Sequence, residues 1–244
     1  MVITGGGRGI GAATALLAAR AGYDVCLSYR SDEQAAGQVA ARIEAVGRRA
    51  WTVQADVSNE ADITRLFRCV DNTGRRLSVL VNNAGTLETH MPVAEMTAAR
   101  LQRVFATNIT GSFLCAIEAV KRMAISRGGA GGAIVNVSSV ASRLGSPNEY
   151  VDYAASKGAI DSFTIGLAKE VAMDGIRVNA VRPGVIYTDI HALGGEPDRV
   201  DRVAGMVPMG RGGQPQEVAE AIMWLASTQS SYTTGTLLDV SGGR

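Results

Sequence analysis

The sequence has little of what nucleic-acid-binding and membrane proteins depend on. Its 24 basic and 23 acidic residues leave a formal net charge of only +1, so no strong attraction to nucleic acid or to an anionic membrane is expected. No apolar run reaches the roughly 18 residues that a membrane-spanning helix requires. No secretory signal peptide is visible at the start of the chain. We therefore expect a cytoplasmic protein that binds neither nucleic acid nor a membrane.

Cysteine and histidine are also scarce. Cys26, Cys69 and Cys115 form no CxxC pair, which indicates structural residues in a reducing compartment rather than a redox pair. The two histidines, His90 and His191, have no partner at the spacing of metal ligands, so we predict no metal site. For His191, a solvent-facing loop position is favoured over contact with a substrate.

Length and patterning fit one α/β domain over residues 1–244. Apolar runs of strand length alternate with longer helical patterns, which predicts a parallel sheet covered by helices on both faces. Right-handed crossovers then give a Rossmann-type, doubly wound sheet of about seven strands. The predicted strands are 2–3, 25–29, 51–54, 77–82, 133–137, 177–181 and 237–240, and the predicted helices include 12–21, 61–72, a region ending near 126, and 153–173. Because the first strand begins at once, we expect that a few native residues precede this start.

One segment breaks the alternation of strands and helices. Residues 186–213 are rich in glycine, proline and charge, and they are long for a connection. Loops of this kind often cover binding sites. We predict that this segment is a substrate lid.

A glycine-rich turn, Thr4 to Gly11, follows the first strand and opens a helix. Glycines let the backbone approach a pyrophosphate closely, and the free N–H groups of a helix start attract it. This placement favours a dinucleotide site over a plain turn. The cofactor-binding residues predicted here are Gly5, Gly7, Arg8, Gly9, Ile10 and Gly11.

The end of the second strand is expected to contact the adenosine ribose. Tyr29 occupies this place, Arg30 follows it, and Arg8 lies nearby in the glycine-rich turn. Basic residues accept the extra phosphate of NADP, so we predict that NADP(H) is preferred over NAD(H). The alternative for Arg30 is a solvated surface charge. Asp32 lies in a capping box that runs from Ser31 to Gln34, so we expect it to hold a helix N-terminus rather than to select NAD.

Polar residues also follow the third and fourth strands, at the edge where ligands bind in open α/β sheets. Asp56 and Val57 follow the third strand, and Asn82 to Gly85 follow the fourth. Asp56 is predicted either to accept a hydrogen bond from the adenine amino group or to cap the next helix.

Ser139, Tyr153 and Lys157 are the candidate catalytic residues. Tyr153 and Lys157 are four positions apart, so they share one face of a helix. The ammonium favours the phenolate and is expected to lower a tyrosine pKa that is ordinarily about 10. Such a tyrosine exchanges a proton with an alcohol or carbonyl oxygen, and the Ser139 hydroxyl could bind the same oxygen.

Motifs along essentially the whole chain resemble those of short-chain dehydrogenases/reductases. They are TGGGRGIG (4–11), DV (56–57), NNAG (82–85), ATNITG (106–111), NVSS (136–139), YAASK (153–157), RVNAVRPG (177–184) and DVSGG (239–243). All of them in this order form a specific signal. The chain looks most like the bacterial group called glucose-dehydrogenase-like or 3-oxoacyl-carrier-protein-reductase-like, of which residues 138–161 are typical.

This resemblance implies a role for each motif residue. Tyr153 would be the acid/base, Lys157 would lower its pKa and bind the nicotinamide ribose, and Ser139 would orient the substrate oxygen. Asn108 would help to hold a water that links Lys157 to solvent. The cofactor would further contact Asp56, Val57, Asn82, Ala84, Gly85, Pro183, Gly184, Ile186 and Thr188.

The spacing of the candidate catalytic residues departs from the family pattern. Family members commonly place tyrosine thirteen residues after serine, whereas Ser139 lies fourteen and Ser138 fifteen residues before Tyr153, so Ser139 is preferred. The extra residue is expected to bulge the 144–151 loop. Tyr150 has no lysine four positions later and is assigned to the pocket wall or the surface.

These features predict an NADP(H)-dependent oxidoreductase that transfers a hydride between nicotinamide and a small-molecule carbonyl or secondary alcohol. One alternative is a 3-oxoacyl-thioester reductase, which needs a docking site for an acidic carrier protein. Another is a non-catalytic cofactor-sensing protein, which is disfavoured because Tyr153 and Lys157 are both present. The only candidates for the docking site are weak: Arg100, Arg103, Lys121 and Arg122.

Family likeness also implies a homotetramer, or a dimer. The face of the predicted helix 153–173 that carries Ala154, Ala155, Ala159 and Phe163 could pack against a second copy, or equally against the sheet.

Overall fold

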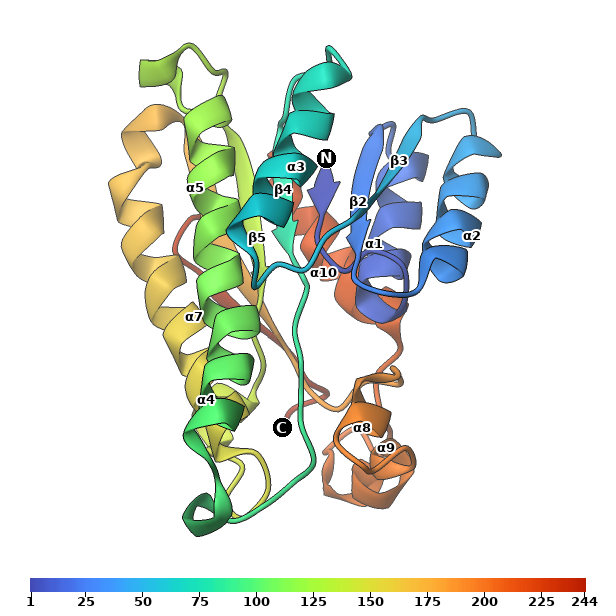
Figure 1. The fold of residues 1–244 in the computed structure, drawn as a ribbon, viewed down its shortest axis with the longest axis vertical. Helices are drawn as coiled ribbons and strands as arrows, with labels where there is room; N and C mark the ends of the chain where they lie inside the picture. Colours follow the sequence, from blue (N-terminus) through green and yellow to red (C-terminus); the bar gives the residue numbers. More distant parts are fainter.

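The computed structural model describes residues 1–244, and its centre is one sheet of seven strands (Figure 1). The strands lie in the order β3-β2-β1-β4-β5-β6-β7, and every neighbouring pair is parallel. Their bounds are β1 Val2–Ile3, β2 Val25–Tyr29, β3 Ala50–Gln54, β4 Val79–Asn82, β5 Gly132–Val137, β6 Ile176–Pro183 and β7 Leu237–Val240. The predicted Rossmann-type, doubly wound sheet in one domain is confirmed.

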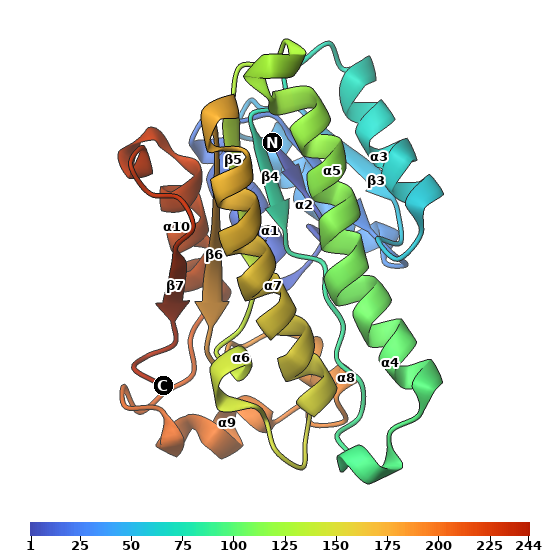
Figure 2. The ribbon, with the colours of Figure 1, turned by 90° about the vertical axis from the view of Figure 1, so that its left-hand side faces the viewer.

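Helices cover both faces of this sheet (Figure 2). On each face, the helices and the strands bury one large cluster of apolar side chains between them. On one face lie α1 (Gly9–Arg20), α2 (Glu33–Glu44) and α10 (Pro215–Ala226). On the other lie α3 (Glu60–Asn72), α4 (Ala98–Phe105), α5 (Gly111–Met123) and α7 (Val151–Glu170). Three short helices, α6 (Ala141–Leu144), α8 (Ile190–Leu193) and α9 (Arg199–Val203), lie beyond the carboxyl ends of the strands.

The helix boundaries differ from the sequence-based ones for local reasons. Helix α1 begins at Gly9, three residues before the predicted start, because the glycine-rich turn supplies its first turn. The N-cap of α2 is Asp32, whose side chain accepts from the Ala35 N–H at 2.9 Å, so the capping box that would begin at Ser31 is wrong while the capping role of Asp32 is confirmed. Helix α10 was not expected, although Pro215 at its first turn is a start signal.

The long helical region that ends near residue 126 is interrupted. Between α4 and α5 the chain forms one π-helical turn, Ala106–Thr110. Such turns inside helices frequently mark functional sites. This one turns Asn108 inward, where only 1% of its surface is exposed.

Two of the three cysteines are buried in the core. Cys26 is 4% and Cys115 is 1% exposed, and burial raises the pKa of both thiols to about 12. At that pKa a thiol is rarely ionised and therefore unreactive, which supports the structural assignment of both.

No group of three or more His, Cys, Asp and Glu side chains is arranged to hold a metal ion. None of the helices combines the length and the apolar character needed to span a bilayer.

Candidate active site

A cavity of about 310 Å³ opens where the carboxyl ends of the parallel strands meet the short helices. Its wall comes from the glycine-rich turn, the ends of β2, β4, β5 and β6, the start of α7, and the segment after β6. Most of the predicted site residues line it. The exceptions are Gly11, Asn82 and Asn108.

The glycine-rich turn forms a backbone cradle in the cavity wall, where Gly5, Gly7 and Gly9 line the cavity. Gly5 and Gly9 have φ angles of 63° and 54°, a left-handed conformation that favours glycine. The Gly5 N–H is held by the Ser28 hydroxyl at 3.2 Å. A side chain on Gly11 would collide with the Gly5 carbonyl, so Gly11 lies behind the cradle and lets α1 approach it. This backbone fits the pyrophosphate of a dinucleotide.

The floor of the cavity is fixed from behind by Thr4. Its hydroxyl accepts hydrogen bonds from the N–H groups of Asn83 and Ala84, both at 3.0 Å. Asn82 is not part of the floor, contrary to prediction, because its amide points into the protein. There it donates to the carbonyl of Ser112 and to the side chain of Asn136.

Two unpaired arginines line the cavity, one in the glycine-rich turn and one directly after β2. Arg8 and Arg30 line the cavity together with Tyr29, both are exposed, and neither forms an ion pair. Asp56 also lines the cavity, and its carboxylate accepts from the Ser58 N–H at 2.9 Å and from the Ser58 hydroxyl at 2.7 Å. The capping alternative for Asp56 is wrong, because the N-cap of α3 is Asn59.

Ser139, Tyr153 and Lys157 line one part of the cavity. Ser139 follows β5, and Tyr153 and Lys157 lie in the first two turns of α7. The neighbouring Ser138 is committed elsewhere, since its hydroxyl donates to Asp161 at 2.7 Å. The hydroxyl of Ser139 accepts from the N–H of Ala141 at 3.1 Å and lies near enough to the Tyr153 hydroxyl to influence its pKa.

Burial dominates the ionisation of both groups on α7. It raises the pKa of Tyr153 to about 12, against the lowering effect of the Ser139 hydroxyl. It lowers the pKa of Lys157 to about 8, against the raising effect of Asp161. The Lys157 ammonium donates to the Val137 carbonyl at 2.8 Å and lies 5.5 Å from the Tyr153 ring centroid. In the protein alone, therefore, Lys157 does not bring the tyrosine pKa below its ordinary value, contrary to expectation.

Asn108 joins the cavity floor to α7 from behind. Its amide nitrogen donates to the Thr86 carbonyl and to the Ser156 hydroxyl, both at 3.0 Å. Its amide oxygen accepts from the Thr86 N–H at 2.8 Å. Both N–H bonds of the amide are used in these contacts, so the side chain could hold the predicted relay water only through its amide oxygen.

The segment after β6 closes the cavity on the side of the glycine-rich turn. Pro183, Gly184, Ile186 and Thr188 line the cavity, and the Thr188 side chain packs against Gly9. His191 lines it as well and is half-buried, with Nε2 donating to the Ile186 carbonyl at 2.9 Å. The expectation of a solvent-facing histidine is therefore wrong.

Four further cavity residues were not named individually from the sequence. Leu193 and Arg199 lie within the predicted lid and Leu144 within the predicted 144–151 loop, whereas Leu87 had no sequence signal. Tyr150 forms part of the wall and is only 3% exposed. Before it, Ser146 and Asn148 adopt left-handed φ angles of 46° and 60°, which agrees with the expected bulge in this loop.

Comparisons with known proteins agree with this geometry. A family model described as enoyl-(acyl carrier protein) reductase matches residues 5–244. The chain is 58% identical over 243 residues to the uncharacterized oxidoreductase YgfF of Escherichia coli, covering 100% of this chain and 98% of that protein. It is 38% identical over 244 residues to a 3-oxoacyl-(acyl-carrier-protein) reductase of Synechocystis, covering 99% and 95%.

Solved structures share both the fold and the length of the chain. A short chain dehydrogenase from Burkholderia cenocepacia in complex with NADP superposes with a TM-score of 0.90 at 30% identity. The match covers 99% of this chain and 96% of that one. The chain therefore belongs to the short-chain dehydrogenase/reductase family and is an oxidoreductase that acts on CH–OH groups with a nicotinamide cofactor.

Proposed function

We propose that the protein is an NADP(H)-dependent carbonyl reductase or secondary-alcohol dehydrogenase with Tyr153 as its general acid/base. One observation carries this proposal: Ser139 and Tyr153 line the same cavity as the glycine-rich cradle, with Lys157 beside them. A substrate oxygen between the two hydroxyls would lie in the cavity that also receives the cofactor.

In the reducing direction, the bound nicotinamide supplies the hydride. Tyr153 donates its phenolic proton to the substrate oxygen, and its pKa of about 12 keeps it protonated at neutral pH for this step. Ser139 donates a hydrogen bond to the same oxygen, where negative charge develops. Lys157 is largely protonated below pH 8, so its ammonium stabilises the phenolate that remains.

Replacing the phenol tests the proposed acid/base. Tyr153→Phe keeps the ring and removes the transferable proton, and general acid catalysis contributes about 10²–10⁴-fold. We expect kcat to fall by at least about 10²-fold while cofactor affinity, measured by fluorescence titration, stays nearly unchanged. Tyr232→Phe makes the same change at a fully exposed site outside the cavity and is the matched control. A Tyr153→Phe enzyme that retained most of its rate would contradict the role of Tyr153.

The preference for NADP(H) rests on Arg8 and Arg30. Both line the cavity and neither has an acidic partner, so both guanidinium groups can bind a ribose phosphate. The Burkholderia relative binds NADP within the same fold. Arg30→Asp is expected to raise KM for NADPH by about tenfold or more and to move the preference toward NADH. A wild-type enzyme that prefers NADH would overturn this assignment.

A 3-oxoacyl-thioester reductase is the second candidate function, since the Synechocystis relative carries that name. The basic residues considered for carrier docking do not favour it. Arg100 is only 3% exposed, and Arg103, Lys121 and Arg122 each pair with an acidic side chain. An assay with acetoacetyl thioesters against simple ketones, aldehydes and sugars separates the two functions. A complete absence of turnover would instead favour a cofactor sensor.

A further inference from the structure

The far end of the cavity, beyond Ser139 and Tyr153, presents apolar side chains. Leu144 on α6 and Leu193 on α8 both line the cavity, yet they are 45% and 42% exposed. Leu87 and Tyr150 also line the cavity, although most of each side chain is buried in the protein. Apolar side chains left exposed in a concave site are typical of a surface that an apolar ligand covers.

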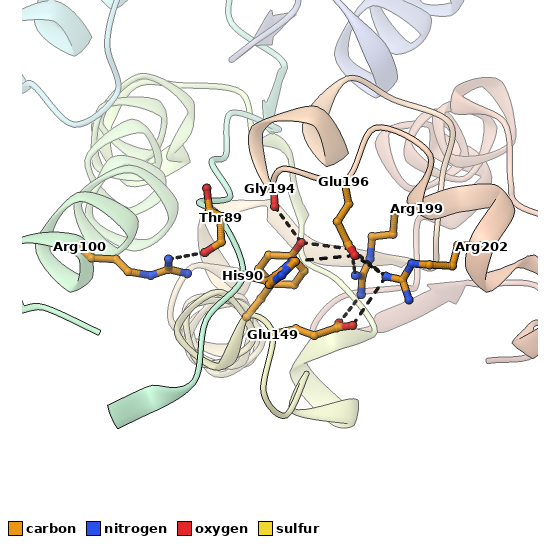
Figure 3. Close-up of polar contacts among 9 residues, drawn as sticks. Thr89, His90, Arg100, Glu149, Gly194, Glu196, Arg199 and Arg202 are labelled. Carbon is orange, nitrogen blue, oxygen red and sulfur yellow. Dashed lines mark hydrogen bonds and ion pairs between the residues drawn. The ribbon is translucent and has the colours of Figure 1, made fainter. Parts of the chain in front are cut away.

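Arg199 brings a positive charge to this wall, but the charge is already neutralised. Its guanidinium lies 5.0 Å from the Tyr150 ring centroid and pairs with the carboxylates of Glu149 and Glu196 (Figure 3). Arg199 lines the cavity, whereas the two glutamates lie behind it. The Arg199 side chain is 13% exposed, so only a small part of it faces the cavity.

Arg199, its two glutamate partners, Tyr150 and Arg202 form one polar cluster, and its remaining groups are also paired with one another. Glu196 binds Arg202 at 2.8 Å, and the Tyr150 hydroxyl donates to the Gly194 carbonyl at 3.3 Å. Two arginines thus meet two glutamates, and their formal charges cancel (Figure 3). Neither arginine is left over for a substrate anion, and His90, the other nitrogen group beside Glu196, lies 3.9 Å from the same carboxylate. A buried unpaired carboxylate would carry a large desolvation cost.

We propose that the substrate is a neutral carbonyl compound or alcohol with an apolar substituent that packs against Tyr150, Leu144 and Leu193. Glu149 and Glu196 set this selectivity by neutralising Arg199. This inference rests on the proposed carbonyl chemistry at Ser139 and Tyr153. It identifies the class of substrate that the same site accepts.

Matched substrates test the inference on the wild-type enzyme. In each pair, one compound is a methyl ketone that ends in an isopropyl group. The other is the keto acid in which a carboxylate, similar in shape, replaces the isopropyl group. The pairs cover a short series of chain lengths. We expect kcat/KM for the ketone to exceed that for the keto acid by about hundredfold or more. Equal values would overturn the inference alone. Turnover of neither compound, nor of any other carbonyl, would instead contradict the proposed function.

The double variant Glu149→Gln/Glu196→Gln tests the role of the glutamates. It frees the charge of Arg199 while keeping side chains of the same shape, so a carboxylate of suitable chain length gains a partner. We expect the ratio of kcat/KM for the keto acid to that for the ketone to rise by about tenfold to hundredfold. Asp71→Asn removes a comparable carboxylate from the pair with Arg122 and should leave the ratio unchanged. An unchanged ratio in the folded double variant would overturn the role of the glutamates.

A third variant covers the case in which the double variant does not fold. Tyr150→Ala removes the aromatic wall, so KM for the isopropyl ketone should rise by about tenfold while KM for acetone, which does not reach the wall, stays within about twofold. Equal effects on both ketones would contradict the proposed packing.

Discussion

Lys157 carries a charge in surroundings that oppose it. Only 4% of its surface is exposed, and its pKa falls from 10.5 to about 8 because the ammonium is desolvated. The hydrogen bond to the Val137 carbonyl and the negative charge of Asp161, which raises the pKa of Lys157, compensate for only part of the lost hydration. The residue therefore costs the fold stability at neutral pH, which is a common property of catalytic groups.

Lys157→Met should stabilise the protein at pH 7 while removing activity. Methionine fills a similar volume without the charge. Because the lysine pKa is lower in the folded state, its cost is complete below about pH 8 and disappears as the pH approaches 10.5. We expect a gain of about 3 kcal/mol at pH 7, by urea denaturation, and almost none at pH 10.5. Lys169→Met, at an exposed site on the same helix, should show no such pH dependence; a gain that persists at pH 10.5 would contradict the explanation.

At the residue scale, sequence spacing favoured the serine whose hydroxyl is available in the cavity but did not predict the ionisation states. Ser139 was preferred over Ser138 by spacing, and the structure supports this because Ser138 is bound to Asp161. The pKa directions depend on how deeply α7 lies against β5, which no local pattern contains. The spacing of Tyr153 and Lys157 therefore indicated proton-transfer chemistry, but it could not predict that burial dominates the pKa values of both groups.

At the element scale, one buried ion pair fixes the start of α7. Arg100 on α4 binds both carboxylate oxygens of Asp152, at 2.7 and 3.2 Å, and also donates to the Thr89 carbonyl. Asp152 in turn accepts from the Tyr153 N–H at 2.9 Å. This pair joins α4 and the loop after β4 to the first turn of the helix that carries Tyr153. Sequence alone offered Arg100 as a surface cation, because its partner lies far away in the chain.

Breaking this pair from one side should be far more damaging than removing it whole. Arg100→Met leaves the Asp152 carboxylate buried without a partner, and we expect a loss of about 3–5 kcal/mol in the free energy of unfolding. Arg100→Met/Asp152→Leu should recover much of this loss, since no buried charge then remains. Both are measured by urea denaturation.

Arg103→Met is the matched control on the same helix. It breaks an exposed pair with Glu88 and should change the stability little. A double variant of the buried pair that is less stable than Arg100→Met would show that the carboxylate is compensated in another way.

At the scale of the whole molecule, the strand alternation predicted the doubly wound sheet, but not which helix faces remain uncovered. The structure shows which of the α7 residues are covered within one chain. Ala154 is buried toward the protein, whereas Ala155 is exposed. Phe163 stacks on Phe113 of α5, with ring centroids 3.8 Å apart. Helices α5 and α7 lie side by side (Figure 2), and this stacked pair joins their adjacent faces into one apolar surface.

This apolar surface on α5 and α7 leads us to predict self-association, as a homotetramer or a dimer. Phe113, Ile117 and Ile165 are 40%, 47% and 37% exposed, and contiguous apolar surface of this kind is typical of protein interfaces. Phe113→Glu would place a charge at its centre, where burial without a partner is unfavourable. Wild-type protein should elute from a sizing column as an oligomer, and the variant should elute at a smaller size. Val46→Glu, at a 48% exposed site just beyond α2, is the control and should elute like the wild type. A wild-type monomer, or a Phe113→Glu variant with an unchanged elution volume, would rule out this face as the interface.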